Sequence, residues 1–187
     1  MKKKISLLIL ACSLNASVVT SVDAAKVIDQ FQPNIDSASI LAIGGSSEQK
    51  LAQTITIDIA GILKGVYLPI NCADGRLKIA INDVVDGEPG SFEYTYNQVR
   101  SARITNQITT FRYFGLPGDL SVEVGDEYAI VIDNPTGSCG ISGSPVGDSY
   151  SGGGGFFDAR PNPPGWVPFE ETESRFDLPF MVLIKTP

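Results

Sequence analysis

Apolar and polar residues alternate with a period of two along several short stretches of the chain. The clearest stretch is residues 77–82, where Leu, Ile and Ile alternate with Lys, Ala and Asn. Further short runs, separated by Gly, Pro, Asp and Asn, alternate at residues 54–57, 66–70, 92–96 and 178–184, are rich in Thr and aromatic residues at 108–114, and are almost continuously apolar at 40–43 and 128–132. This period predicts strands that bury one face and leave the other in water.

Helical signals are weak, because Gly and Pro are spread through the whole chain. Only residues 49–53 and 96–102 favour a short helical turn. About nine to ten strands without crossover helices predict an all-β fold, an antiparallel and jelly-roll-like β-sandwich. The length of 187 residues suits one ordinary domain, which we place at residues 25–187.

Residues 1–24 have the pattern of a secretory signal peptide. Lysines at positions 2–4 precede an apolar run, and the short side chains at positions 22–24 predict cleavage after Ala24. The mature protein is then secreted, periplasmic or at the cell surface. A lipoprotein anchored through Cys12 is disfavoured by the short apolar run before that cysteine. The whole apolar stretch, residues 5–19, is too short, and too rich in Ser and Asn, for a membrane anchor.

Cleavage makes the protein more acidic. It removes three lysines and one aspartate from totals of 14 Lys+Arg and 21 Asp+Glu, so the net charge changes from −7 to about −9. An acidic domain is poorly suited to neutralise phosphates, which argues against nucleic acid as a partner. No later stretch is apolar for long enough to predict a membrane span.

The chain has no histidine and 3 cysteines. The missing histidine excludes a Ser-His-Asp triad, a Cys-His pair and a His-ligated zinc site. Cys72 and Cys139 remain after cleavage, and two cysteines in an oxidising compartment most simply form one disulfide. A free reactive thiol is the alternative, disfavoured because no activating cation lies nearby in the sequence.

Residues 137–168 are dominated by Gly, Ser, Pro and aromatic residues, which predicts a long loop that is functional or partly disordered, with part of it paired as an edge strand. Its aromatic and charged residues suit a glycan, because a sugar ring has an apolar face and polar hydroxyls. The candidate ligand-binding residues are Tyr150, Trp166, Asp148, Asp158 and Arg160. The alternative is that the rings seal the open end of the sandwich or cover an edge strand.

A cluster of carboxylates around a Gly turn is a candidate metal site. Calcium prefers oxygen ligands, so Asp83, Asp86 and Glu88 are the first candidates for a structural calcium ion. No Asp-x-Asp-x-Asp-Gly loop is present, and a solvated acidic face is the simpler interpretation. No other cofactor is indicated.

Several motifs occur in a characteristic order. They are residues 52–56, 63–68, 124–131, 148–153, Phe156-Phe157, Trp166 and residues 177–180. In these motifs the chain resembles bacterial extracellular β-sandwich domains of the carbohydrate-binding and galactose-binding-like jelly-roll type. The resemblance covers nearly all of the mature chain, although such domains are usually appended to larger proteins. It implies a non-catalytic module and transfers no catalytic residue.

The sequence therefore predicts a secreted or surface-associated, non-catalytic binding module, whose partner is a glycan or another cell-surface component. Two alternatives remain open. One is a structural or matrix assembly protein, given a lone sandwich with exposed edges. The other is a carboxylate-dependent glycoside hydrolase, which needs two acids in a cleft.

Overall fold

The computed structural model describes residues 24–100, 108–161, 165–172 and 174–187. Cys12 and all but the last residue of the predicted signal peptide, residues 1–24, lie outside the described residues. The strands are β1 (Lys26–Gln32), β2 (Asp36–Gly44), β3 (Lys50–Thr56), β4 (Gly61–Leu68), β5 (Ile70–Cys72), β6 (Arg76–Val85), β7 (Glu88–Arg100), β8 (Arg112–Val122), β9 (Glu127–Asp133), β10 (Ser138–Gly143), β11 (Gly155–Asp158), β12 (Val167–Pro168) and β13 (Phe180–Lys185).

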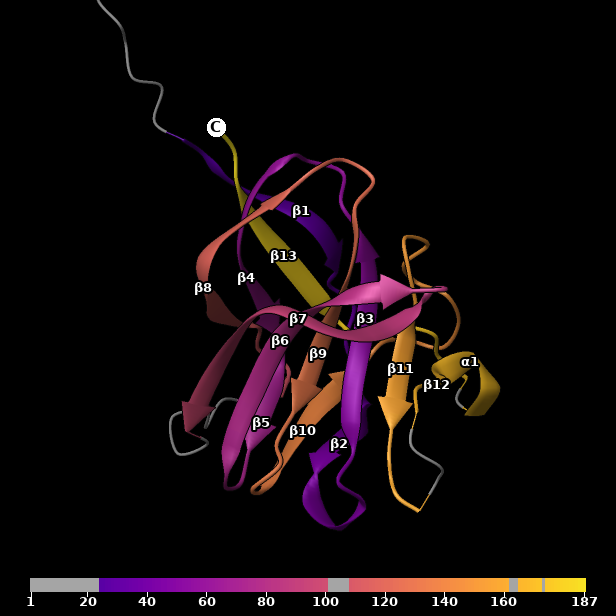
Figure 1. The fold of residues 1–187 in the computed structure, drawn as a ribbon. Coiled ribbons are helices and arrows are strands. Elements are labelled where there is room, and N and C mark those ends of the chain that lie inside the picture. The colour runs from indigo at the N-terminus through magenta and orange to yellow at the C-terminus, as the bar shows by residue number, and fades with distance from the viewer. Residues whose placement is uncertain (1–23, 101–107, 162–164, 173) are drawn as a thin grey trace, which may run out of the picture.

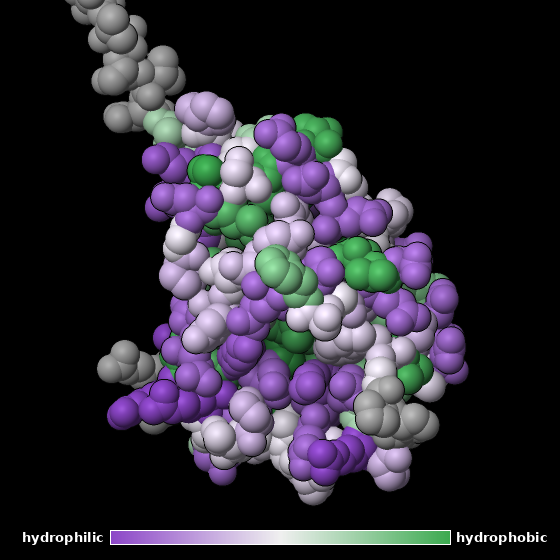
Figure 2. Space-filling model, in the orientation of Figure 1, coloured by the Kyte–Doolittle hydropathy of each residue, from purple (hydrophilic) through white to green (hydrophobic). Residues whose placement is uncertain are grey.

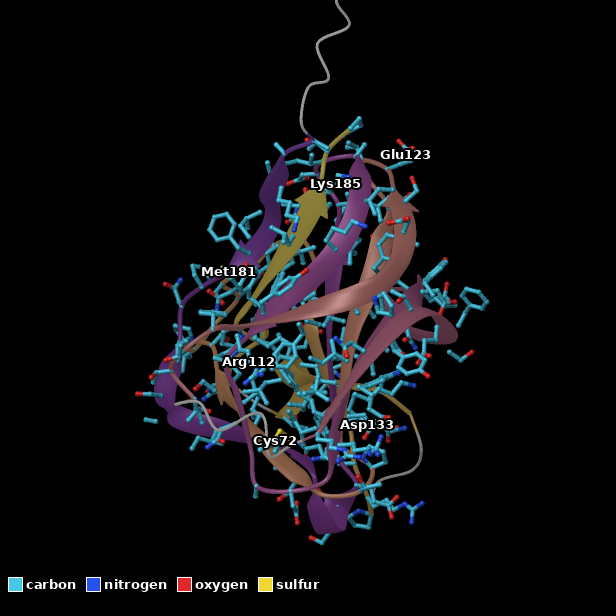
Figure 3. All side chains as sticks on the ribbon, turned by 90° about the vertical axis from the view of Figure 1, so that its left-hand side faces the viewer. Cys72, Arg112, Glu123, Asp133, Met181 and Lys185 are labelled. Atoms are coloured by element: carbon cyan, nitrogen blue, oxygen red, sulfur yellow. A yellow bond between two sulfur atoms is a disulfide. The ribbon has the colours of Figure 1, made fainter. Side chains whose placement is uncertain are left out.

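The strands form three antiparallel sheets in two layers. A six-stranded sheet, in the order β12-β11-β3-β9-β6-β7, makes the front layer in Figure 1. Behind it lie a four-stranded sheet, β1-β13-β4-β8, and a three-stranded sheet, β2-β10-β5. Figure 3 views the sandwich from the side, with Met181 of β13 and Asp133 of β9 on opposite layers. The predicted all-β antiparallel sandwich is confirmed.

The differences from the predicted elements are local. The described residues contain more strands than expected, because β5 and β12 have only 3 and 2 residues and β1 is largely polar. The predicted helical turns are wrong: residues 49–53 mostly belong to β3, and residues 96–100 belong to β7. The helical turns observed are η1 (Gly45–Ser47) and α1 (Phe169–Thr172). No helix in the described ranges is long and apolar enough to cross a bilayer.

The core lies between the layers and is built from the inward residues of the alternating strands. The front layer supplies Leu51, Ile55, Leu77, Ile79, Ile81, Ile130 and Ile132, and the rear layer supplies Val66, Leu68, Ile70, Phe114, Ile141, Phe180, Val182 and Ile184. Each of these side chains is at most 2% exposed. Burying such a side chain contributes about 1.5–3 kcal/mol, so the alternation fixes which face of each strand turns inward.

A buried carboxylate ties the segment before β13 to the rest of the fold. Asp177 is fully buried, and its side chain accepts hydrogen bonds from the backbone N–H groups of Ser149 and Tyr150, both at 2.9 Å. The Gln53 side chain of β3 donates a further bond at 3.2 Å and accepts one from the N–H of Leu178. A buried carboxylate needs such donors, so Asp177 fixes the loop after β10 against β3.

The predicted disulfide between Cys72 and Cys139 is present. The two residues face each other directly across the β5–β10 pair, and each is 7% exposed. The Asn134 side chain donates a hydrogen bond to the Cys139 sulfur at 3.2 Å. The cross-link lies at the lower end of the sandwich in Figure 3 and holds β5, a strand of only 3 residues, in its register.

Replacing both cysteines, in the variant Cys72→Ala/Cys139→Ala, should lower the free energy of unfolding by about 4 kcal/mol. The physical reason is that a cross-link across 67 residues restricts the unfolded chain. Urea unfolding of both proteins measures the difference, and the wild type under reducing conditions serves as the control. An unchanged unfolding midpoint in the variant would contradict this role.

Candidate functional site

The outer face of the six-stranded sheet gathers polar side chains because of the same alternation that builds the core. Lys78 of β6 lies opposite Asp133 of β9, and Ala80 lies opposite Val131. Lys50 opens β3 at the same level of the sheet. Figure 2 shows this face as mainly hydrophilic around a small apolar hollow. Charged groups therefore surround an apolar floor at the centre of the sheet.

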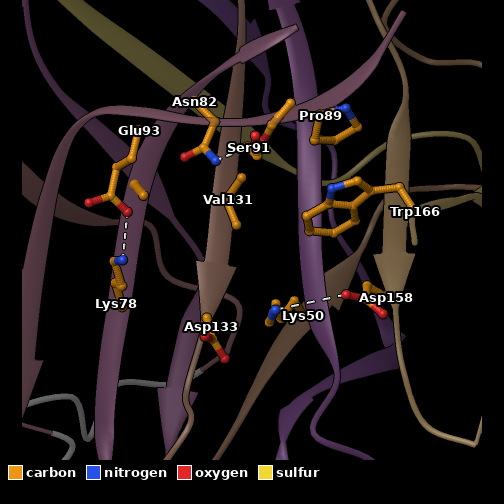
Figure 4. A pocket seen from close by; sticks show the side chains of 12 residues that line it. Lys50, Lys78, Asn82, Pro89, Ser91, Glu93, Val131, Asp133, Asp158 and Trp166 are labelled. Carbon is orange, nitrogen blue, oxygen red and sulfur yellow. Dashed lines mark hydrogen bonds and ion pairs between the residues drawn. The ribbon is translucent and has the colours of Figure 1, made fainter. Parts of the chain in front are cut away.

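A cavity of about 430 Å³ lies over this floor. Its floor includes Ala80 and Val131, and its polar lining comes from β3, β6, β7, β9 and β11. Trp166 lies on one side of the cavity, and the ion pair between Lys78 and Glu93 lies on the other (Figure 4). The volume falls within the range of ordinary small-ligand sites.

Trp166 is held in place by its chain neighbours and remains partly exposed. It directly precedes β12, which pairs with β11. Phe169, three residues on, is 1% exposed and stacks on Phe157 with ring centroids 6.2 Å apart. Gly155 is required beneath it, because a Cβ there would collide with the Phe169 ring. The indole therefore stands on an anchored segment rather than on a free loop.

The hairpin between β6 and β7 forms another wall. Asp86 and Gly87 both have positive φ, the backbone of a tight two-residue hairpin turn. The Asn82 side chain donates to the carbonyl of Gly90 at 3.0 Å, and Asp83 accepts from the N–H of Phe92 at 2.8 Å. These bonds fix the returning strand beside the cavity.

The charges of the site are mostly paired. Lys50 lies 3.8 Å from the Asp158 carboxylate, and Lys78 pairs with Glu93. Asp133 lies near both lysines. Burial raises the pKa of the Asp133 carboxyl above its ordinary value, and the two ammonium groups oppose that rise only in part. Partly desolvated polar groups of this kind interact more strongly with a ligand than exposed ones do.

A second cavity, of about 540 Å³, continues from the first. The two share Lys50, Asp133 and Asp158. The second cavity is also lined by Arg160 and Glu48, whose ion pair measures 3.1 Å. We call the two cavities together the β-sheet groove.

The structure brings only part of the predicted ligand-binding set together. Trp166, Asp158 and Arg160 line the β-sheet groove. Asp148 is exposed and lines a different, smaller cavity of about 170 Å³. The segment 137–168, expected as one long loop, is divided by β10, β11 and β12, which carry these residues to different places.

Tyr150 belongs to the core. It is 9% exposed, and its ring packs edge-on against Phe180 with centroids 5.0 Å apart. Its hydroxyl donates to Gln30 at 2.9 Å and accepts from the N–H of Thr56 at 3.3 Å. Burial raises the pKa of Tyr150 to about 12, so the hydroxyl keeps its proton. The polar tip of Tyr150 therefore joins β1 and β3.

The candidate calcium ligands lie on the same hairpin as the groove wall. Asp83 is engaged by the N–H of Phe92, while Asp86 and Glu88 are exposed at the turn. Among the residues with described positions, no group of three or more His, Cys, Asp or Glu side chains is placed to hold a metal ion. Asp83 thus stabilises the β6–β7 hairpin by accepting a hydrogen bond from the backbone of β7.

Sequence reasoning did not assign the charged groove residues Glu48, Lys50, Lys78, Glu93 and Asp133. A signal for two of them was present: Lys78 lies on the wet face of the most regular alternating run, and Asp133 ends an apolar strand. The missing information was the pairing of β6 with β9 and of β9 with β3, which joins segments far apart in sequence.

Comparison with family models, with curated proteins and with solved structures finds no significant match to this chain. The resemblance to extracellular carbohydrate-binding domains gains no support from these comparisons. A functional assignment therefore depends on the chemistry of the β-sheet groove itself.

Lowering the pH from neutral towards about 4 should stabilise the protein. Burial raises the pKa of Asp29, Asp133 and Asp177 above 3.8. A carboxyl with a raised pKa binds protons more tightly in the folded state. It therefore lowers stability at neutral pH, and this penalty disappears as the pH falls towards 3.8. Thermal unfolding across this range measures the effect.

The variant Asp133→Asn should show a smaller rise in stability on acidification than the wild type. Asp119→Asn is the control, because Lys64 lowers the pKa of the Asp119 carboxyl. Protonation of Asp119 therefore changes stability only below pH 3.8. A melting temperature that falls steadily as the pH is lowered from neutral to about 4 would contradict the assigned directions.

Proposed function

We propose that the protein is a secreted or surface-associated module that binds glycans non-catalytically in the β-sheet groove. The observation that carries the proposal is the partly exposed Trp166 ring beside an apolar floor with a polar rim. The buried disulfide suits an oxidising compartment outside the cytoplasm.

The chemistry of the groove matches that of a sugar ring. A pyranose has apolar C–H faces and hydroxyls around its edge. The indole of Trp166 and the floor of Ala80 and Val131 offer apolar surface to the C–H faces. The carboxylates and ammonium groups of the rim accept and donate hydrogen bonds to hydroxyls. Few polar groups are needed to orient such a ligand.

The charges favour a neutral glycan. Lys50, Lys78 and Arg160 each form an ion pair with an acid of the same groove. Asp133 adds further negative charge, and the whole chain has a net charge of −7. A polyuronate or a nucleic acid is negatively charged and would be repelled by this negatively charged surface.

The variant Trp166→Ala should bind a glycan roughly 30-fold more weakly than the wild type, because truncating a central aromatic contact costs about 2 kcal/mol or more. A glycan array of neutral oligosaccharides identifies the ligand, and isothermal titration calorimetry measures the loss.

Phe31→Ala is the matched control. Phe31 is an aromatic side chain of β1, 57% exposed, and it lies in the rear layer. Its removal should leave glycan affinity unchanged. Thermal unfolding verifies that both variants fold. The proposal fails if the wild type binds no neutral glycan, or if Trp166→Ala binds as well as the wild type.

A second candidate function is glycoside hydrolysis. Asp133 and Asp158 both line the groove beside Lys50, and the raised pKa of Asp133 is what a general acid requires. In that case the protein would release reducing ends from a neutral polysaccharide, and Asp133→Asn would abolish the release. Binding without release of reducing ends favours the binding module.

A further inference from the structure

The β6–β7 hairpin bounds the β-sheet groove at one end. In Figure 1 the β6–β7 hairpin crosses in front of β9 and β3, and β7 contacts both strands. Pro89 is buried in this crossing segment and lines the groove together with Gly90. A Cβ on Gly90 would collide with the Asp83 carboxylate. The start of β7 therefore packs closely against the end of β6.

The other end of the groove is bordered by exposed residues of the described chain. Its lining residues Glu48, Pro135, Arg160 and Pro161 are all exposed. Trp166 lines the cavity next to the hairpin and does not line the second cavity. The groove therefore has a direction, from an aromatic, hairpin-capped end to a charged, exposed exit.

We propose that the groove recognises the end of a glycan chain. The terminal sugar lies against Trp166 under the hairpin, and the rest of the chain leaves past Arg160. This inference rests on the proposed glycan-binding function and specifies its ligand. An internal chain segment would need an opening at both ends, whereas a chain terminus needs only one.

The size of the groove agrees with a short terminal oligosaccharide. The two parts measure about 430 and 540 Å³, and they overlap at Lys50, Asp133 and Asp158. Ligand sites of a few hundred cubic ångström hold molecules of drug-like size. Sugars beyond the first few would extend into water and add little to the affinity.

Titration calorimetry with linear neutral chains tests the inference. The probes are oligosaccharides of glucose, xylose, mannose and N-acetylglucosamine, from disaccharides to hexasaccharides, with a long chain of each type. For the chains that bind, we expect one protein per chain at every length. We also expect no binding of cyclic glucans, which contain the same sugar without an end.

A variant at the open end tests the direction of the chain. Arg160→Ala should weaken the binding of hexasaccharides by about threefold and leave disaccharides unaffected, because an exposed polar contact contributes little. Lys185→Ala, an exposed cationic residue of β13 outside the groove lining, is the matched control and should leave both affinities unchanged.

The outcomes separate this inference from the proposed function. Several proteins per long chain, or cyclic glucans bound as well as linear ones, would overturn end recognition and leave glycan binding intact. Equal weakening of disaccharides and hexasaccharides by Arg160→Ala would overturn the assigned direction. Absence of binding to every neutral sugar would remove both proposals.

Discussion

The strict alternation of side chains along β3, β6 and β9 is the constraint on which the rest of the molecule depends. The pairing of these three strands sets seven buried aliphatic side chains against the rear layer, so their other face is forced outward as a coherent surface. A slip of one residue in Leu77–Ile81 would bury Lys78 and expose its apolar neighbours. Core and groove are thus two consequences of one register.

The groove combines a rigid floor with anchored walls. Its floor belongs to central strands, and its Trp166 wall is fixed by the buried Phe169. The opposite wall is the β6–β7 hairpin, which is held by hydrogen bonds of the Asn82 and Asp83 side chains. Such a site needs little ordering when a ligand arrives, which favours affinity. Paired charges also leave the rim polar without a strong field of one sign.

The sequence predicts the fold class well, because a period of two and frequent turn residues report directly on local backbone. It also predicts Asp86-Gly87 as a turn and Cys72–Cys139 as a cross-link. It places Trp166, Asp158 and Arg160 among the candidate residues but adds Tyr150, since a Tyr near Gly and Asp gives no sign of which way its ring points. Lys50, Lys78 and Asp133 were missed because only long-range strand pairing brings them together.

The position of β13 has a consequence for how the chain acquires its structure. Residues 180–185 pair with β1 on one side and with β4 on the other. The four-stranded sheet therefore cannot form until these residues are in place. Contacts between segments so distant in sequence require closure of most of the chain, and such topologies fold slowly. The rear layer is therefore completed only after the last strand described here has been made, and a nascent chain stays open until then.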